Sequence, residues 1–169
     1  DPRMSVAELV AEPLREFRRG LVGASRRAQV TTMLGRVGLG SELLERFPHQ
    51  LSGGQAQRVG IARALMLGPE LLICDEPVAA LDMSIKSQVA NLLRDMRHEF
   101  GLTLLFIAHD LATVRYLCER VLVLYLGRCM EIAGRDALFS APQHPYTRAL
   151  LAANPVPDPA RARRAPPLV

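Results

Sequence analysis

Lysine and aromatic residues are scarce in this 169-residue sequence. Lys86 is the only lysine, aromatic residues make up 5% of the chain, and the formal net charge is +4. The arginines that supply the other positive charges are scattered among acidic residues. Nucleic-acid-binding proteins instead gather basic residues on one face or along one helix. The composition therefore does not favour a surface that binds nucleic acid.

Metal-binding patterns and long apolar runs are missing as well. The three cysteines, Cys74, Cys118 and Cys129, lack the spacing of zinc ligands. We expect Cys74 and Cys118 to be small buried hydrophobic residues with reduced thiols. No apolar run reaches the roughly eighteen residues that a membrane-spanning helix needs, and no stretch resembles a signal peptide. We therefore expect a cytoplasmic protein.

The stretch Leu51-Ser52-Gly53-Gly54-Gln55 has the features of a helix start that binds an anion. Ser52 is a strong N-cap residue, and the two glycines allow a ligand to approach the backbone closely. Free N–H groups at a helix N-terminus attract anions, above all phosphate. This stretch is a candidate phosphate contact.

A second loop with the chemistry of a nucleotide site follows the apolar run 71–74. The run predicts a buried strand, and Asp75, Glu76 and Pro77 come directly after it. Open α/β sheets bind their ligands at the carboxyl ends of the strands. An isolated acidic pair at such a place is usually a helix cap or a solvated turn. Here Pro77, the apolar run and the upstream glycine loop together favour a functional pair.

Hydrophobic periodicity and helix breakers predict a chain of mixed helices and strands. Ser5 and Glu8 form a capping-box pattern for a first helix, which we expect Pro13 to kink or end. Further elements are predicted as helices over 25–37, 41–46, 52–67, 85–99 and 111–118, strands over 71–74, 102–108, 120–126 and 129–133, and short helices within 136–153. Asp82 or Ser84 is expected to cap the helix over 85–99. From Asn154 onward, prolines and arginines predict an irregular or disordered tail.

The succession LSGGQ, QRVGIARAL and LLICDEP resembles the ATP-binding-cassette (ABC) ATPases. The stretches DPRMSVAELVAEPL, DEPVAALDMS and HPYTRALLAANPVPDP resemble one branch, the ATPase subunits of bacterial oligopeptide/dipeptide importers. The resemblance covers nearly the whole chain. It implies an α/β fold, the P-loop NTPase (RecA-like) core of an ABC ATPase, present in part. The implied domains are a helical signature subdomain over 1–67, the partial core over 68–140 and the family's C-terminal segment over 141–169.

The resemblance also implies roles for single residues in ATP hydrolysis with Mg²⁺. Asp75 would hold the Mg²⁺, Glu76 would be the general base for the attacking water, and His109 would contact the γ-phosphate. Asp82 would meet the partner subunit of a head-to-tail dimer. The signature loop would press on the γ-phosphate held by the opposite subunit through Ser52, Gly53, Gly54 and Gln55.

Further partners follow from the same resemblance. Membrane permease subunits would dock on the outer surface of the helical subdomain, and a peptide-binding protein would act indirectly. The protein would lie peripherally at the cytoplasmic face of the inner membrane. Nucleic acid is not an expected partner.

A P-loop, GxxxxGK[ST], does not occur in the sequence. In that motif backbone amides cradle phosphates and a lysine reaches the β- and γ-phosphates, whereas Lys86 lies within a predicted helix. The family's Q-loop glutamine and adenine-stacking aromatic residue also precede the position of Asp1. We therefore expect the C-terminal part of an ABC ATPase, which alone neither binds ATP tightly nor hydrolyses it. We also expect it to expose apolar surface and a sheet edge.

Two other functions remain open at this point. A soluble ABC ATPase that acts on nucleic acid shares these motifs, but such proteins usually carry zinc modules, coiled coils or long insertions that the sequence lacks. A non-catalytic remnant that only binds partner subunits is supported solely by the missing P-loop. The sequence does not tell which peptide is carried or whether the partner ATPase is identical.

Overall fold

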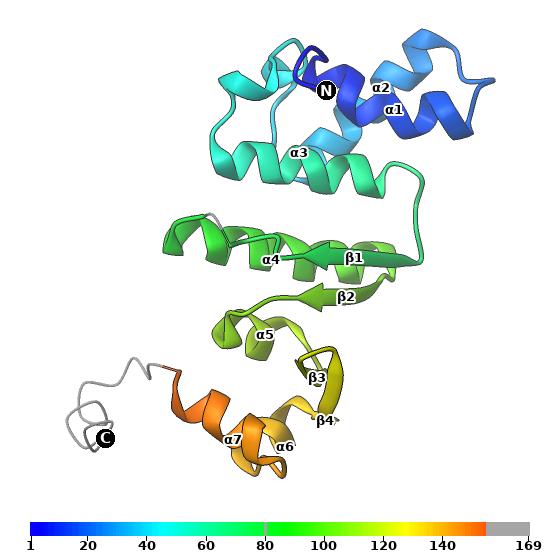
Figure 1. Cartoon of the computed structure of the whole chain (residues 1–169). Helices are drawn as coiled ribbons and strands as arrows, with labels where there is room; N and C mark the ends of the chain where they lie inside the picture. Colours follow the sequence, from blue (N-terminus) through cyan, green and yellow to red (C-terminus); the bar gives the residue numbers. More distant parts are fainter. Residues whose placement is uncertain (80, 155–169) are drawn as a thin grey trace. The chain divides into compact units, whose positions relative to one another are not determined.

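The computed structural model describes residues 1–79 and 81–154, which form two compact units. The first unit comprises residues 1–108, and the second begins at His109. Figure 1 shows the helices and strands of each unit, coloured along the chain from blue to red. Each unit has a core of its own, because large apolar side chains such as Leu34 in the first unit and Leu138 in the second are almost fully buried.

Three helices form the first part of the first unit (Figure 1). They pack against one another and are α1 (Val6–Phe17), α2 (Gly23–Arg36) and α3 (Gly53–Leu65). Two single turns of 3-10 helix lie between α2 and α3, namely η1 (Ser41–Leu43) and η2 (Pro48–Gln50). The predicted start of α3 is confirmed, with Ser52 as its N-cap, whereas the helix ends at Leu65, two residues before the predicted end. Gly68, with φ +63°, follows in the loop.

The prediction that Pro13 kinks or ends the first helix is wrong in its stronger form. The capping box between Ser5 and Glu8 is present as predicted, but α1 continues through Pro13 to Phe17. Inside a helix, proline removes the hydrogen bond that its own N–H would donate, and its ring crowds the carbonyl four residues before it. Val10 and Leu14, on either side of it, are both fully buried. Burial of this apolar stripe therefore holds the helix together past the proline.

The helix predicted over 41–46 is also a correction, because only the single turn η1 forms there. Gly40 precedes this segment and Pro48 follows it closely. A proline disfavours helical geometry in the residue before it, and a segment this short does not recover the cost of starting an α-helix. Leu43 and Leu44 are nevertheless buried and anchor the turn to the core.

A strand–helix–strand unit completes the first unit. α4 (Met83–Phe100) connects β1 (Leu71–Asp75) to β2 (Thr103–Ile107), and the two strands are parallel. Gly101 ends α4 in the left-handed conformation, with φ +64°, as a C-terminal glycine is expected to do. The register pairs Asp75 with Ile107, so both strands present their carboxyl ends at the same edge.

The two strands are covered on one face only, where the inward side chains are buried in β1 and half-buried in β2. Leu72 and Cys74 are buried, and burial raises the pKa of the Cys74 thiol to about 11. The prediction that the run 71–74 forms a buried strand is therefore wrong for the other face of the sheet, where four apolar side chains are about half exposed. These are Leu71 at 49%, Ile73 at 58%, Leu105 at 50% and Ile107 at 47%. The expected exposure of apolar sheet surface is confirmed.

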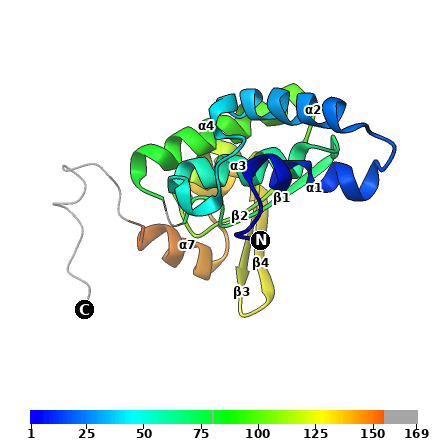
Figure 2. The same ribbon diagram turned by 90° about the horizontal axis from the view of Figure 1, so that it is seen from above.

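The second unit is built on a hairpin. α5 (Leu111–Leu117) precedes the antiparallel strands β3 (Arg120–Tyr125) and β4 (Arg128–Gly134), which Figure 2 shows in yellow. Leu126 and Gly127 form the turn and have φ values of 47° and 73°. Positive φ at both central residues is the geometry of tight hairpin turns. The predicted hairpin is confirmed. The expectation that Cys118 is buried is wrong, because this residue is only half-buried, and Cys129 is exposed.

Two short helices complete the described part of the second unit, α6 (Arg135–Ser140) and α7 (Pro145–Ala152). Glu131 of β4 accepts hydrogen bonds from the backbone N–H groups of Gln143, at 3.0 Å, and His144, at 3.0 Å. The Nδ1 atom of His144 in turn accepts the Tyr146 N–H and caps α7. The rings of Tyr146 and Tyr125 lie 4.4 Å apart. His144 and Tyr146 therefore fix α7 to the hairpin.

The remaining expectations concern membranes and the tail. Among the described residues, no helix is both long enough and apolar enough to cross a bilayer. The tail predicted to be irregular falls almost entirely on residues 155–169, which lie outside the described residues.

Candidate functional site

The glycine loop starts α3 with a capping box. Ser52 Oγ accepts the Gln55 N–H at 3.2 Å, and the Gln55 side chain accepts the Ser52 N–H at 2.9 Å. The first N–H groups of a helix have no partner within the helix, and this box does not involve those of Gly53 and Gly54. The Ser52 side chain is exposed at this helix start. The predicted N-cap is confirmed, and the loop keeps the geometry in which backbone amides attract an anion.

The two glycines also allow a close approach within the protein. Gly54 is buried, and a Cβ atom at this position would lie 2.8 Å from Ile85 Cγ2 of α4. A Cβ atom at Gly53 would lie 3.3 Å from Leu81 Cδ2. Sequence reasoning assigned these glycines to ligand approach alone. It missed their packing because Gly54 and Ile85 are distant in the sequence.

Asp82 caps α4 at the end that Gly53 and Gly54 approach. Its carboxylate accepts the Ile85 N–H at 2.9 Å and the Ser84 hydroxyl at 2.8 Å. These two hydrogen bonds, the Ile85 one foremost, lower the pKa of Asp82. The carboxylate therefore carries its charge at the positive end of the α4 dipole. Of the two predicted capping residues, Asp82 is the N-cap.

The acidic pair lies exposed after β1. Asp75 is the last residue of the strand, and Glu76 follows with φ +45°, a conformation that non-glycine residues rarely adopt. The Glu76 N–H donates to the Ile107 carbonyl at 2.9 Å, and the Glu76 carbonyl accepts the Ala79 N–H at 3.2 Å. Both backbone groups of Glu76 are thus held, one by β2 and one by the following turn.

His109 belongs to the second unit, where it precedes Asp110, the N-cap of α5, and its side chain is exposed. Asp110 caps α5, since its carboxylate accepts the Ala112 N–H at 3.0 Å and also bonds the Thr113 hydroxyl. The structure thus brings the glycine loop to the Asp82 helix start and places the acidic pair at the sheet edge of the same unit.

The acidic pair suits a metal ion that is held by one or two protein side chains better than one that protein ligands surround. The described residues contain no group of three or more His, Cys, Asp or Glu side chains that could enclose a metal ion. Mg²⁺ keeps several of its waters and commonly takes one or two carboxylates together with substrate phosphates. An exposed carboxylate at a strand end, such as Asp75, suits that mode of binding.

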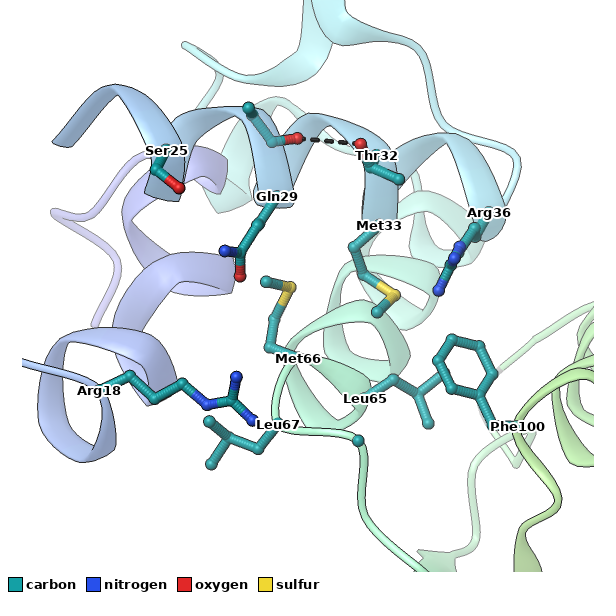
Figure 3. A pocket seen from close by; sticks show the side chains of 12 residues that line it. Arg18, Ser25, Gln29, Thr32, Met33, Arg36, Leu65, Met66, Leu67 and Phe100 are labelled. Carbon is teal, nitrogen blue, oxygen red and sulfur yellow. Dashed lines mark hydrogen bonds between the residues drawn. The ribbon is translucent and has the colours of Figure 1, made fainter. Parts of the chain in front are cut away.

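A cleft of about 450 Å³ lies on the helical part of the first unit (Figure 3). Figure 3 shows Gln29 and Met33 of α2 pointing into it above Leu65 and Met66 at the end of α3. The Arg36 guanidinium lies 5.1 Å from the centre of the Phe100 ring and pairs with Glu99 at 3.3 Å. The cleft therefore has an apolar floor and a basic rim.

Comparison with known proteins identifies two family regions. The model of the ABC transporter family matches residues 1–79, and the model of the oligopeptide/dipeptide transporter C-terminal region matches residues 130–168. The oligopeptide transport ATP-binding protein OppF of Escherichia coli (strain K12) is 53% identical over 159 residues, which are 94% of this chain and 48% of that protein. The protein of the same name from Haemophilus influenzae is 50% identical over the same shares of the two chains.

Solved structures agree in fold. The dimeric ATP-binding cassette MJ0796, bound to ADP and phosphate, superposes with a TM-score of 0.70 at 32% identity. The match covers 80% of this chain and 58% of that one. The cassette cbiO1 from Clostridium perfringens gives a TM-score of 0.71 at 33% identity, covering 81% of this chain and 53% of that one.

These likenesses define the class as an ABC ATPase cassette with the P-loop NTPase fold, of which a partial α/β core is present. The chain is thus similar to the ABC transporter family over residues 1–79 and to the oligopeptide/dipeptide transporter C-terminal region over residues 130–168. It spans about half the length of the curated relatives it matches.

Proposed function

We propose that this chain works within the ATP-hydrolysing subunit of a bacterial peptide importer. The observation that carries the proposal is the pair of exposed groups in the first unit: an amide-lined helix start at Ser52 and two carboxylates at the end of β1. The first attracts phosphate, and the second suits a metal ion and an attacking water. The identity with OppF proteins favours peptide as the transported substrate.

Each group has its own task in the proposed reaction. Asp75 holds Mg²⁺, which when bound neutralises charge on the phosphates. Glu76 orients and deprotonates the attacking water. The hydrogen bonds of its backbone N–H and carbonyl fix the position of the backbone from which this side chain extends. His109 donates a hydrogen bond to the γ-phosphate. The loop Ser52–Gln55 contacts the γ-phosphate of the opposite subunit, and Asp82 lies at that same dimer interface.

The proposed partners are a second ATPase subunit, arranged head to tail, and membrane permease subunits at the cytoplasmic face. A peptide-binding protein acts through the permease.

We assign the cleft in Figure 3 to the permease, because an apolar floor with a charged rim is the usual make-up of a protein–protein contact. Thr32, exposed at the cleft, offers a test: Thr32→Arg should weaken co-purification of the permease, and Thr31→Arg, outside the cleft, should not.

The catalytic proposal is tested by Glu76→Gln in the transporter ATPase that contains these residues. ATP binding should persist while turnover falls by about a hundredfold or more, because the glutamine amide cannot accept a proton from the attacking water. Glu70→Gln, just before β1, is the matched control and should turn over ATP normally. Turnover of Glu76→Gln close to that of the control would remove Glu76 as the base.

The partner and the absence of a P-loop are tested separately. Affinity purification from solubilised membranes should recover permease subunits; recovery of nucleic acid instead would favour the soluble ABC ATPase that acts on nucleic acid.

Residues 1–169 alone should give no binding heat with MgATP in calorimetry. Micromolar affinity there would contradict the expectation that a GxxxxGK[ST] segment is needed.

A further inference from the structure

We propose that Ile85 is a positioning residue that fixes the glycine loop at the start of α3 to the Asp82-capped start of α4. The inference rests on the proposed function in one respect only, the contact of this loop with nucleotide phosphate. The packing itself is a property of the chain.

The contact between Gly54 and Ile85 leaves no room for a side chain. A Cβ atom on Gly54 would lie 2.8 Å from Ile85 Cγ2, closer than carbon atoms pack. Cγ2 is attached directly to Cβ, and β-branched residues in helices have essentially one χ1 rotamer. Ile85 therefore cannot turn this methyl group aside. Either α3 or α4 would have to move.

The same residue is tied to Asp82. The Ile85 N–H is the group that the Asp82 carboxylate caps, at 2.9 Å. A displacement of Ile85 therefore disturbs the N-cap of α4 as well. Leu81, the residue before Asp82, lies against the position of Gly53 in the same way.

A second contact one turn further on holds the same two helices. Arg58 of α3 donates to the Gln88 side chain of α4 at 3.3 Å and to the Val37 carbonyl at the end of α2 at 2.8 Å. Gly54 and Arg58 are four residues apart on α3, and Ile85 and Gln88 are three apart on α4, so each pair lies on one helix face. The glycine loop and the Asp82-capped start of α4 are therefore held together at two points, by the Gly54–Ile85 packing and by Arg58.

Two roles of Gly54 can be separated by a compensating substitution. If Gly54 is needed because Ile85 lies against it, Ile85→Ala removes the obstructing methyl group and should accommodate an alanine at position 54. If Gly54 is needed only because nucleotide approaches the backbone, shortening Ile85 cannot help. Gly60→Ala is the matched control, since it lies on the same helix and a Cβ atom there meets nothing within 4 Å.

The first measurement is amide hydrogen exchange on the 169-residue chain without nucleotide. Gly54→Ala should accelerate exchange of the Ile85 amide, on the other helix, by about tenfold or more, because overpacking must be relieved there. Gly60→Ala should leave that amide unchanged, and Gly54→Ala/Ile85→Ala should exchange like Ile85→Ala alone. Equal exchange in Gly54→Ala and Gly60→Ala, or additive effects in the double variant, would overturn the proposal. If Gly54→Ala fails to fold, folding of the double variant supports the proposal, and its failure where Ile85→Ala folds refutes it.

The second measurement is ATP turnover in the transporter ATPase that contains this chain. Gly54→Ala should lower kcat, and adding Ile85→Ala should recover part of the lost turnover. Lack of recovery, with Ile85→Ala alone active, would show that the nucleotide and not Ile85 excludes the alanine. The exchange experiment needs no nucleotide, so a failed proposed function would leave its result standing.

Discussion

Glu131 of the second unit and the acidic pair Asp75 and Glu76 of the first unit differ in position and in contacts. In the second unit, Glu131 is engaged by the N–H groups of Gln143 and His144, which lower its pKa and attach α7 to the hairpin. In the first unit, Asp75 and Glu76 lie exposed at a strand end, where the backbone of Glu76 is hydrogen-bonded through both its N–H and its carbonyl. The comparison teaches that residue type alone does not separate a structural carboxylate from a candidate site residue, and that Asp75 and Glu76 differ from Glu131 by their exposed position at a strand end.

Each unit also has one non-glycine residue with positive φ among the described residues. Glu76 has φ +45° and Leu126 has φ +47°. Glu76 stands at the candidate catalytic edge, whereas Leu126 is 83% exposed at the hairpin turn. A left-handed conformation costs a non-glycine residue about 1–2 kcal/mol. The same local strain therefore accompanies a proposed chemical role in one unit and a turn in the other.

The largest effect is expected at Glu76. Glu76→Gly should raise the free energy of unfolding by about 1 kcal/mol, since glycine adopts positive φ readily, while turnover falls by about a hundredfold or more. Denaturant unfolding of the chain and ATP hydrolysis by the assembled transporter measure the two quantities. Glu76→Gln, which keeps the strained backbone, should lose turnover without gaining stability. A lower free energy of unfolding in Glu76→Gly would contradict the inference that the positive φ of Glu76 destabilises the chain.

An intermediate effect is expected for Glu131 as a function of pH. Because the folded-state pKa of Glu131 is lowered, its stabilising contribution is present above its ordinary pKa and is lost as the pH falls through the folded value. The protection of the α7 amides, which is the ratio of their intrinsic to their observed exchange rate at each pH, should therefore fall on acidification in the wild type. In Glu131→Gln this protection should be lower already at neutral pH and should lack this acid step. An unchanged acid step in Glu131→Gln would assign it to another group.

The smallest effect is expected at the hairpin turn. Leu126→Asn should raise the free energy of unfolding by about 0.5–1 kcal/mol, because asparagine tolerates the left-handed conformation and the leucine side chain is exposed. Turnover should not change. Thermal unfolding of the chain gives the measurement, with Leu124→Asn, in the neighbouring strand, as a control that should not be stabilised. Destabilisation by Leu126→Asn would mean that the leucine makes a contact essential to the unit.

Local chemistry made much of this structure predictable. Ser52, Asp82 and Gly101 act as caps through groups within three or four residues of themselves, so their roles can be read from the sequence. The hairpin at Gly127 and the buried Cys74 are predictable for similar reasons.

Features that depend on distant residues were not predictable. Pro13 stays inside α1 because the stripe around it is buried by α2 and α3, which no local pattern reveals. The one-sided burial of β1 depends on what packs on each face of the sheet. The contact of Gly54 with Ile85 joins two helices separated by β1, and only a folded chain displays it.

Photolabelling with an ATP analogue that carries a reactive group on its γ-phosphate tests the central claim most directly. In the assembled transporter ATPase, the label should appear in the peptides that contain Ser52–Gln55 and Asp75–Glu76, and excess unlabelled ATP should suppress it. Labelling that spares both peptides, while ATP still competes for the label elsewhere, would contradict the claim that these two loops face the terminal phosphate.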